Sequence, residues 1–174
     1  MDERPIIEKL RKIELFKDIK DDKERLARLA GIVSVQRCKA GNHVITEGEE
    51  GSELYILNKG TVCILKRTLD NDVFTIVTLA NNEDVFFGEL ALMDEELRSA
   101  SVVAETDCEL LVINRDDFSR LGEEDPRLGL MVTRAIGRAL SKRLRKTNED
   151  LIILFEALVG EVAEGDQLEE TVED

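Results

Sequence analysis

Short β-rich segments follow one another between residues 32 and 113, and this succession constrains the fold more than any other feature of the chain. Each segment is a few residues long, and runs containing glycine, asparagine or aspartate separate it from the next. Many short strands at this spacing are typical of an antiparallel sandwich or barrel. The predicted strands are 32–38, 43–46, 53–57, 61–67, 73–79, 101–105 and 109–113.

Helical patterns precede and follow these strands. Residues 5–16 and 21–31 predict two short amphipathic helices, and a third is expected near residues 116–121. Asp125-Pro126 is then typical of an N-cap followed by proline in the first helical turn. A long helix is expected from there to about residue 163, so the fold class is α+β.

Apolar residues recur along this long helix in alternating steps of four and three. Such a seam indicates a partner helix, and we expect a parallel two-fold dimer; packing of the helix on its own domain is the alternative. The seam consists of Leu140, Leu144, Thr147, Leu151, Leu154 and Leu158. Thr147 is its only polar member, and because a polar seam residue costs stability, it suggests a functional role.

The net charge of −14 is concentrated near the C-terminal end. Residues 147–174 hold ten acidic residues and neither lysine nor arginine, whereas the first 146 residues hold 24 basic and 28 acidic ones. Neutralising phosphates dominates nucleic-acid affinity, so we expect no direct nucleic-acid partner. The longest apolar run, 151–155, is too short to span a bilayer, and the charged N-terminus does not resemble a signal peptide. We therefore expect a cytoplasmic protein without a membrane partner.

Nothing in the sequence indicates catalysis. We find no pairing of a nucleophile with a base, no metal-ligand spacing and no Walker-type loop, so neither an enzyme nor a metal or other cofactor is expected. The single histidine, His43, is interpreted as a surface turn residue. Cys38, Cys63 and Cys108 are scattered, which argues against a disulfide framework; each is expected to be a small apolar residue of a strand.

The segment 86–104 is the strongest indication of a ligand site. Gly88 opens a short helical run expected at residues 89–94, and Arg98 follows ten positions later. Because glycine has no Cβ, an anion can approach its backbone closely, while arginine offers a planar charged fork opposite. The free amides of the helix start would also point at the anion; they belong to Glu89, Leu90 and Ala91. This pattern predicts a pocket for one phosphate.

Two alternatives compete with this interpretation. Arg98 could instead bridge a nearby acid, namely Asp94, Glu95 or Glu96. Glu89 could be an exposed acid of a first helical turn, favoured by the helix dipole.

Together these features resemble the cyclic-nucleotide-binding domains of bacterial catabolite-activator proteins and protein kinase A regulatory subunits. The resemblance extends from Leu15-Phe16 to the long helix. Its motifs are Ala40-Gly41, Ile45-Thr46-Glu47-Gly48, Leu54-Tyr55-Ile56-Leu57, Gly60, and a phosphate-binding cassette, Phe87-Gly-Glu-Leu-Ala-Leu92 followed by Arg98-Ser-Ala100. The family's strand into the cassette often has a glycine before its aspartate, where this chain has Glu83-Asp84 and one extra residue.

The resemblance implies an antiparallel β-roll, of the double-stranded β-helix or jelly-roll type, between N-terminal helices and a long C-terminal dimerisation helix. The expected parts are N-terminal helices at 1–31, the roll at 32–121 with its cassette at 86–104, a hinge and long helix at 122–163, and a disordered acidic tail at 164–174.

The resemblance also implies roles for individual residues. The backbone around Gly88 and Leu90 would hold the cyclic phosphate, and Arg98 would pair with its equatorial oxygen. Glu89 would accept a hydrogen bond from the ribose 2′-hydroxyl, and Ser99 would add a hydroxyl to the phosphate. Thr147 and Asn148 fall where two polar residues of the long helix meet the purine, one from each subunit; Asn148 is larger than the usual serine or threonine.

Three functions are weighed. The first is a sensor that binds a cyclic nucleotide, cAMP in preference to cGMP, and so shifts the long helix and tunes a homodimer or an unknown protein partner. The second is a ligand-free interaction module with a degenerate pocket, favoured if Arg98 is bonded to the protein's own acids without a cavity beside Gly88. The third is a transcription regulator acting through a separate DNA-binding partner, although no helix-turn-helix pattern follows residue 147.

Overall fold

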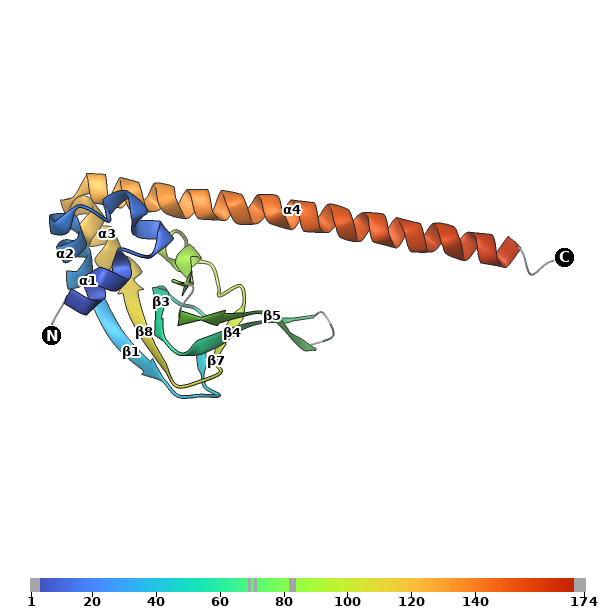
Figure 1. The fold of residues 1–174 in the computed structure, drawn as a ribbon, viewed down its shortest axis with the longest axis horizontal. Coiled ribbons are helices and arrows are strands. Elements are labelled where there is room, and N and C mark those ends of the chain that lie inside the picture. Colours follow the sequence, from blue (N-terminus) through green and yellow to red (C-terminus); the bar gives the residue numbers. More distant parts are fainter. Residues whose placement is uncertain (1–3, 69, 71, 82–83, 171–174) are drawn as a thin grey trace. The chain divides into compact units, whose positions relative to one another are not determined.

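The computed structural model describes residues 4–68, 70, 72–81 and 84–170, with side chains described as far as Val159. The chain divides into two units, Met1–Ile136 and Gly137–Asp174. The first unit holds the described strands, the shorter helices and the start of the last helix (Figure 1). The second unit consists of the remainder of that helix and the segment that follows it.

The described residues of the first unit form two four-stranded antiparallel sheets. The strand order is β1-β8-β3-β6 in one sheet and β2-β7-β4-β5 in the other. Strands far apart in sequence lie side by side, as β1 does with β8 and β2 with β7, so the chain forms the expected β-roll. In sequence order the strands are β1 (Val33–Cys38), β2 (His43–Ile45), β3 (Glu53–Lys59), β4 (Thr61–Arg67), β5 (Val73–Ala80), β6 (Phe86–Phe87), β7 (Ser101–Ala104) and β8 (Cys108–Asn114).

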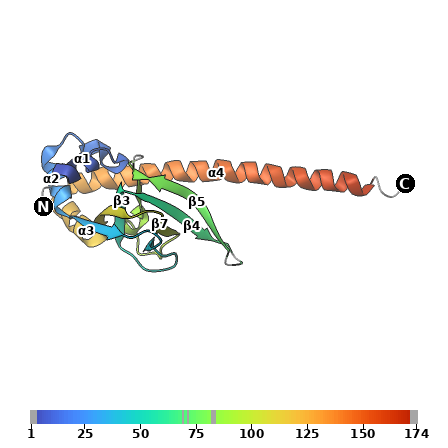
Figure 2. The ribbon, with the colours of Figure 1, turned by 60° about the horizontal axis from the view of Figure 1, so that its bottom comes forward.

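The predicted α+β class with an antiparallel β-roll is confirmed. The seven expected strands are present with ends shifted by at most two residues, and the short β6 is an addition. β6 was missed because two residues are too few to show a periodic pattern. Figure 2 shows β4 and β5 as a long hairpin at the edge of the second sheet.

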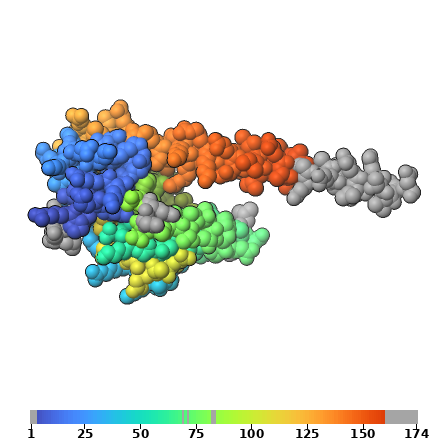
Figure 3. Space-filling model, in the orientation of Figure 1, coloured from blue at the N-terminus to red at the C-terminus, as the bar shows by residue number. Residues whose placement is uncertain are grey.

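The core of the roll is formed by alternate residues of strands from both sheets. Leu57 of β3 and Leu110 of β8 are fully buried in it, as is Val62 of β4. The intervening residues of the central strands are buried as well, including Leu54 and Ile56. Both faces of these strands are therefore covered, and Figures 1 and 3 show the N-terminal helices beside the roll.

The first predicted helix, at residues 5–16, is wrong in its extent. The chain instead forms α1 (Arg4–Leu10) and a separate 3₁₀ helix, η1 (Glu14–Ile19). Ile13, just before the start of η1, and Phe16, within its first turn, are at most 1% exposed. The burial of these two side chains decides the local conformation, because tertiary packing of this kind overrides helix propensity. The second helix is α2 (Lys23–Gly31), capped by the Asp22 side chain, which accepts from the Arg25 amide at 3.1 Å.

The long helix begins where its capping signal indicated, and the short helix expected near residues 116–121 is present as a longer one. Asn114 caps α3 (Arg115–Glu124) by accepting from the Asp116 amide at 2.9 Å. Asp125 accepts from the Leu128 amide at 3.1 Å at the start of α4 (Pro126–Glu170), and this bond is the main cause of the lowered pKa of Asp125.

α4 ends later than expected. It continues to Glu170, beyond the end expected near residue 163. The disorder expected for residues 164–174 stays a prediction. Glutamate, alanine, leucine and glutamine in this stretch favour helix, and charge alone did not reveal this. Residues 171–174 of the predicted tail, like residues 1–3 and Glu83, lie outside the described residues.

Replacing the buried Leu110 by alanine tests the core. Leu110→Ala is expected to lower the free energy of unfolding by about 2–5 kcal/mol, because it removes contacts and leaves a cavity between the sheets. Urea denaturation followed by circular dichroism measures the change. The control is Leu130→Ala, whose side chain is 51% exposed on α4 and should change stability by no more than about 0.5 kcal/mol.

Candidate functional site

Gly88 adopts a conformation that favours glycine. Its φ of 76° and ψ of 18° are left-handed, and it forms the N-cap of the short 3₁₀ helix η3 (Glu89–Leu92). A Cβ on Gly88 would lie 2.9 Å from the carbonyl oxygen of Glu53 and 3.0 Å from Nη1 of Arg98. The structure thus brings Gly88 and Arg98 together, as the sequence analysis expected, with no room for a side chain between them.

The main chain of Arg98 is held by a turn distant in sequence. Its amide donates to the Glu49 carbonyl at 2.9 Å, and its own carbonyl accepts from the Gly48 amide at 2.9 Å. These two bonds fix the origin of the side chain, which runs inward and is only 8% exposed.

The guanidinium of Arg98 is occupied by Glu53, the first residue of β3. Nη1 donates to the Glu53 carbonyl oxygen and Nη2 to the Glu53 carboxylate oxygen Oε2, both at 3.0 Å. Burying a charge is costly unless it is paired and hydrogen-bonded, so Glu53 stabilises the cation inside the protein. The alternative that Arg98 bridges Asp94, Glu95 or Glu96 is wrong, because its acidic partner lies 45 residues away.

Gly51 and Tyr55 complete the surroundings of this arginine. A Cβ on Gly51 would overlap the guanidinium group, so only glycine leaves space there. Cζ of Arg98 lies 5.9 Å from the centre of the Tyr55 ring, within the range of a cation–π contact. Tyr55 also stacks on Phe87, with ring centres 5.5 Å apart, and burial raises the pKa of its hydroxyl.

The remaining cassette residues differ in their exposure. Glu89 is only 2% exposed, so the alternative of an exposed first-turn acid is wrong. The Ala91 amide donates to the Gly88 carbonyl at 3.2 Å, so the prediction of three free amides fails at this residue. Leu90 is half-buried and Ser99 is exposed.

A lysine of β4 ties the cassette to the neighbouring strand. Lys66 Nζ donates to the carbonyl of Ser99 at 2.5 Å and to Oε1 of Glu47 at 2.6 Å. This lysine lowers the pKa of the Glu47 carboxyl, and the Glu47 amide in turn donates to Oγ of Ser101 at 3.0 Å. The main chain of Ser99, the residue after Arg98, is therefore anchored to β4.

An open polar depression lies beside the arginine. It has a volume of about 370 Å³ and is lined by Glu50, Gly51, Ser52, Glu95 and Arg115. Its volume falls within the range of small-molecule sites, about 300–1,000 Å³. Gly51, where a Cβ atom would overlap the Arg98 guanidinium, forms part of the wall of this depression.

Sequence reasoning missed Glu53, Gly51, Tyr55 and Lys66. Gly51 and Tyr55 stand in or beside motifs that were noticed, but no spacing rule connects them to Arg98. Only the pairing of distant strands brings them together, as in the register that sets Tyr55 opposite Phe87.

Thr147 and Asn148 lie on the part of α4 that belongs to the second unit, and both are exposed. Their role as base contacts stays a prediction.

Among the residues described here, no group of three or more histidine, cysteine, aspartate or glutamate side chains is arranged to hold a metal ion. No helix of the described part combines the length and apolar character needed to cross a membrane.

Comparison with known proteins identifies the family. The family described as "Cyclic nucleotide-binding domain" matches residues 35–125, which is more than half of the chain. The chain therefore belongs to the cyclic-nucleotide-binding domain family. This match includes most of β1, all of β2 to β8, and both Gly88 and Arg98.

Similar sequences include signalling proteins of several organisms. The chain is 37% identical to human cGMP-dependent protein kinase 2 over 113 residues, which are 64% of this chain and 14% of the kinase. It is 34% identical to the cyclic AMP receptor protein of Thermus thermophilus over 124 residues, 71% of this chain and 55% of that protein. The chain thus spans less than two thirds of these curated relatives.

Solved structures share the fold. A cyclic nucleotide-binding domain from Methylobacillus flagellatus matches with a TM-score of 0.73 and 26% identity, covering 86% of this chain and 82% of that one. A regulatory subunit of a cAMP-independent protein kinase A from Trypanosoma cruzi, bound to guanosine, matches with a TM-score of 0.64 and 25% identity, covering 75% and 43%.

Alanine at Gly88 tests the close approach of its backbone to Arg98. Gly88→Ala is expected to destabilise the protein for two reasons, the left-handed conformation, which costs about 1–2 kcal/mol, and the contacts with Glu53 and Arg98. Gly41→Ala is the matched control, because Gly41 has a φ of 83° but open space around it. Denaturant titration should show a larger loss for Gly88→Ala; equal losses would contradict the crowding at this position.

Proposed function

We propose that the protein is a sensor that binds a cyclic nucleotide through its phosphate, which is held by Arg98 and by the backbone around Gly88 and Leu90. The observation that supports this most is a guanidinium, 8% exposed, that faces the bare backbone of a left-handed glycine. Such a fork matches two oxygens of a phosphodiester, and the glycine allows the anion to approach closely. Membership of the family supports the class of ligand.

Binding requires the phosphate to replace a group that already occupies the arginine. The Glu53 carboxylate carries one negative charge and so does a cyclic phosphodiester, so the two anions compete for Nη2 of Arg98. The bond from Nη1 to the Glu53 carbonyl can remain during this exchange. Glu53 therefore lowers the affinity for the ligand. The binding free energy contains only the difference between the pairing of Arg98 with the phosphate and its pairing with Glu53.

The finer roles are those that the resemblance to the family implies. Glu89 accepts a hydrogen bond from the ribose 2′-hydroxyl, and the hydroxyl of Ser99 joins the phosphate contacts. The purine is met by Thr147 and Asn148, with cAMP preferred over cGMP. The names of two relatives, a cyclic AMP receptor protein and a cGMP-dependent kinase, support either purine, so both nucleotides belong in the test.

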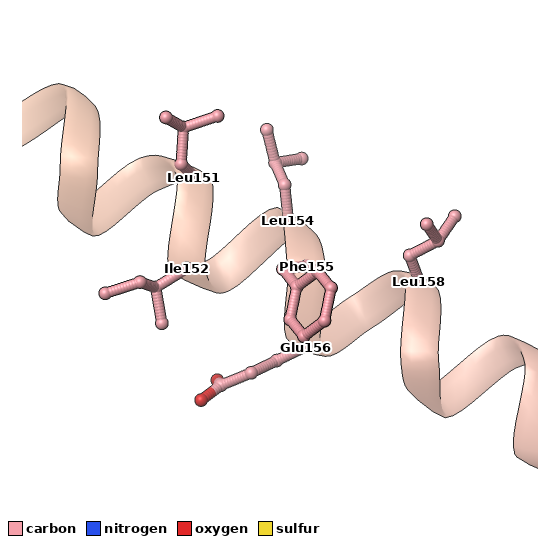
Figure 4. Close-up of a pocket in the computed structure, with 6 residues that line it drawn as sticks. All are labelled: Leu151, Ile152, Leu154, Phe155, Glu156 and Leu158. Atoms are coloured by element: carbon pink, nitrogen blue, oxygen red, sulfur yellow. The ribbon is translucent and has the colours of Figure 1, made fainter.

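The output of the sensor is a movement of the long helix. We expect the protein in the cytoplasm. The helix pairs with a second copy through its leucine seam, and ligand binding tunes this homodimer or an outside partner. Leu140 is half-buried, whereas Leu144, Leu151, Leu154 and Leu158 are 57–65% exposed. Figure 4 shows three of them, Leu151, Leu154 and Leu158, projecting from the helix beside Ile152 and Phe155. Side chains this apolar are costly to leave in water, which favours a partner helix.

A second candidate function is a ligand-free interaction module. The ion pair of Arg98 with Glu53 supports it, because the protein's own acid already satisfies the arginine. The neighbouring depression also does not include Gly88 among its lining residues. The Trypanosoma cruzi regulatory subunit is bound to guanosine, an uncharged nucleoside, so guanosine is tested here as a third ligand beside cAMP and cGMP.

Calorimetric titration with cAMP, cGMP and guanosine separates these functions. The wild-type protein is expected to bind a cyclic nucleotide, Arg98→Ala to lose at least about 100-fold in affinity, and Arg98→Lys to restore little, because lysine lacks the planar fork. Arg120→Ala, at a side chain 68% exposed on α3, is the control and should bind normally. Glu53→Gln should bind more tightly, because the competing charge is gone.

The outcomes of this titration are distinct. Absence of heat with all three ligands supports the interaction module. Binding of guanosine with an affinity insensitive to Arg98→Ala would show that the phosphate is not what the site recognises.

Polar substitutions in the seam test the homodimer. Leu151→Gln with Leu154→Gln is expected to convert a dimer to a monomer, because both side chains lose their apolar contacts with the partner helix. Glu149→Gln with Glu156→Gln is the matched control, since these positions lie on the opposite side of the helix in the seam's periodicity. Size-exclusion chromatography with light scattering gives the mass; a wild-type monomer at about 100 μM, well above the usual Kd of a stable dimer, would refute the dimer.

A further inference from the structure

Cys38 and Cys108 are direct partners across the strand pair β1–β8. Their Cα atoms are opposite one another in the antiparallel register, at the end of β1 and the start of β8. Residues directly opposite in such a pair point to the same face of the sheet. Both belong to the same core cluster, with exposures of 8% and 4%. Figure 1 shows the two strands side by side.

We propose that Cys38 and Cys108 are a redox-sensitive dithiol that closes to an intramolecular disulfide. Directly opposed residues in antiparallel strands have Cα atoms about 4.5–5.5 Å apart, which lies within the range of about 4.4–6.8 Å found for disulfides. The Cβ atoms need only a small approach. The bridge therefore requires rotation of two side chains rather than movement of the sheet.

Both thiols now point to main-chain oxygens. Sγ of Cys108 donates to the carbonyls of Thr106 and Thr61 at 3.2 and 3.3 Å, and Sγ of Cys38 contacts the carbonyl of Asn42 at 3.7 Å. Thiols are weak donors, so these bonds cost little to break. A Cβ on Gly60 would lie 2.7 Å from Sγ of Cys108, so the glycine leaves that thiol the space it occupies.

Cys63 provides an internal comparison. It is also buried and in the same unit, and its Sγ lies 3.3 Å from Oγ1 of Thr78. Its partners in the sheet are Thr78 on one side and Val103 on the other. It therefore has no opposed cysteine and should not form this bridge.

A hydroperoxide can supply the oxidant. The thiolate that reacts first attacks hydrogen peroxide and becomes a sulfenic acid, with release of one water after protonation. The second thiol attacks this sulfur, the S–O bond breaks, the S–S bond forms, and a second water leaves. Two thiols and one peroxide thus yield one disulfide and two waters, and the two electrons pass to the peroxide.

Burial makes this reaction slow at neutral pH. It raises the pKa of the Cys38 thiol, and the nearby Cys108 and Asp107 add to the shift, so little thiolate is present. Oxidation should accelerate by roughly tenfold per pH unit below the pKa of the attacking thiol. Thiol–disulfide exchange with a reductant breaks the bond again, so the change is reversible.

Peptide mapping after oxidation tests the proposal. The full chain is treated with hydrogen peroxide at pH 7 and pH 9 under native conditions, alkylated with iodoacetamide, and analysed by mass spectrometry without reduction. The expected product has lost two hydrogens, carries one alkyl group on Cys63, and links the peptides of Cys38 and Cys108. Dithiothreitol should reverse it, and its melting temperature should exceed that of the reduced protein by about 5–15 °C.

Variants make the result specific. Cys38→Ala and Cys108→Ala should each abolish the linked product, whereas Cys63→Ala should retain it. Oxidation of all three cysteines to sulfinic acids, a link that includes Cys63, or links only between chains would each overturn the proposal, and the wild-type map alone decides among them.

Discussion

The candidate site depends on one buried cation and the acid that pairs with it. A guanidinium 8% exposed is tolerated because Glu53 offers it both a carboxylate oxygen and a carbonyl oxygen at 3.0 Å. The absence of side chains at Gly51 and Gly88 leaves the room that Arg98 occupies. An anionic ligand that displaces the Glu53 carboxylate must stabilise the Arg98 guanidinium at least as well, through its own charge and hydrogen bonds.

The same acid connects the arginine to the helices after the roll. Oε1 of Glu53 accepts from the hydroxyl of Ser52 at 3.3 Å, and that hydroxyl accepts from Nδ2 of Asn114 at 2.9 Å. Asn114 in turn caps α3 through the Asp116 amide. Release of Glu53 by a ligand would act on this chain of hydrogen bonds, which gives the proposed sensor a physical route from its pocket to the start of α3.

The two largest differences between sequence and structure have a common origin. The arginine was expected to be satisfied by a neighbouring acid or by a ligand, yet its partner is 45 residues away. The scattered cysteines argued against a disulfide framework, yet Cys38 and Cys108 are opposed across two strands. In both cases the partner is chosen by the register between strands, which local spacing does not express.

Local signals in the sequence determined the strands with their turns, the capped start of α4 at Asp125, and the glycine that opens the cassette. Each depends on the backbone preferences of a few adjacent residues, which act wherever the rest of the chain lies. Only the tertiary structure decided that Glu53 pairs with Arg98, that the first helix stops at Leu10, and that β6 exists. These features depend on burial and long-range pairing, whose free energies arise only when distant segments meet.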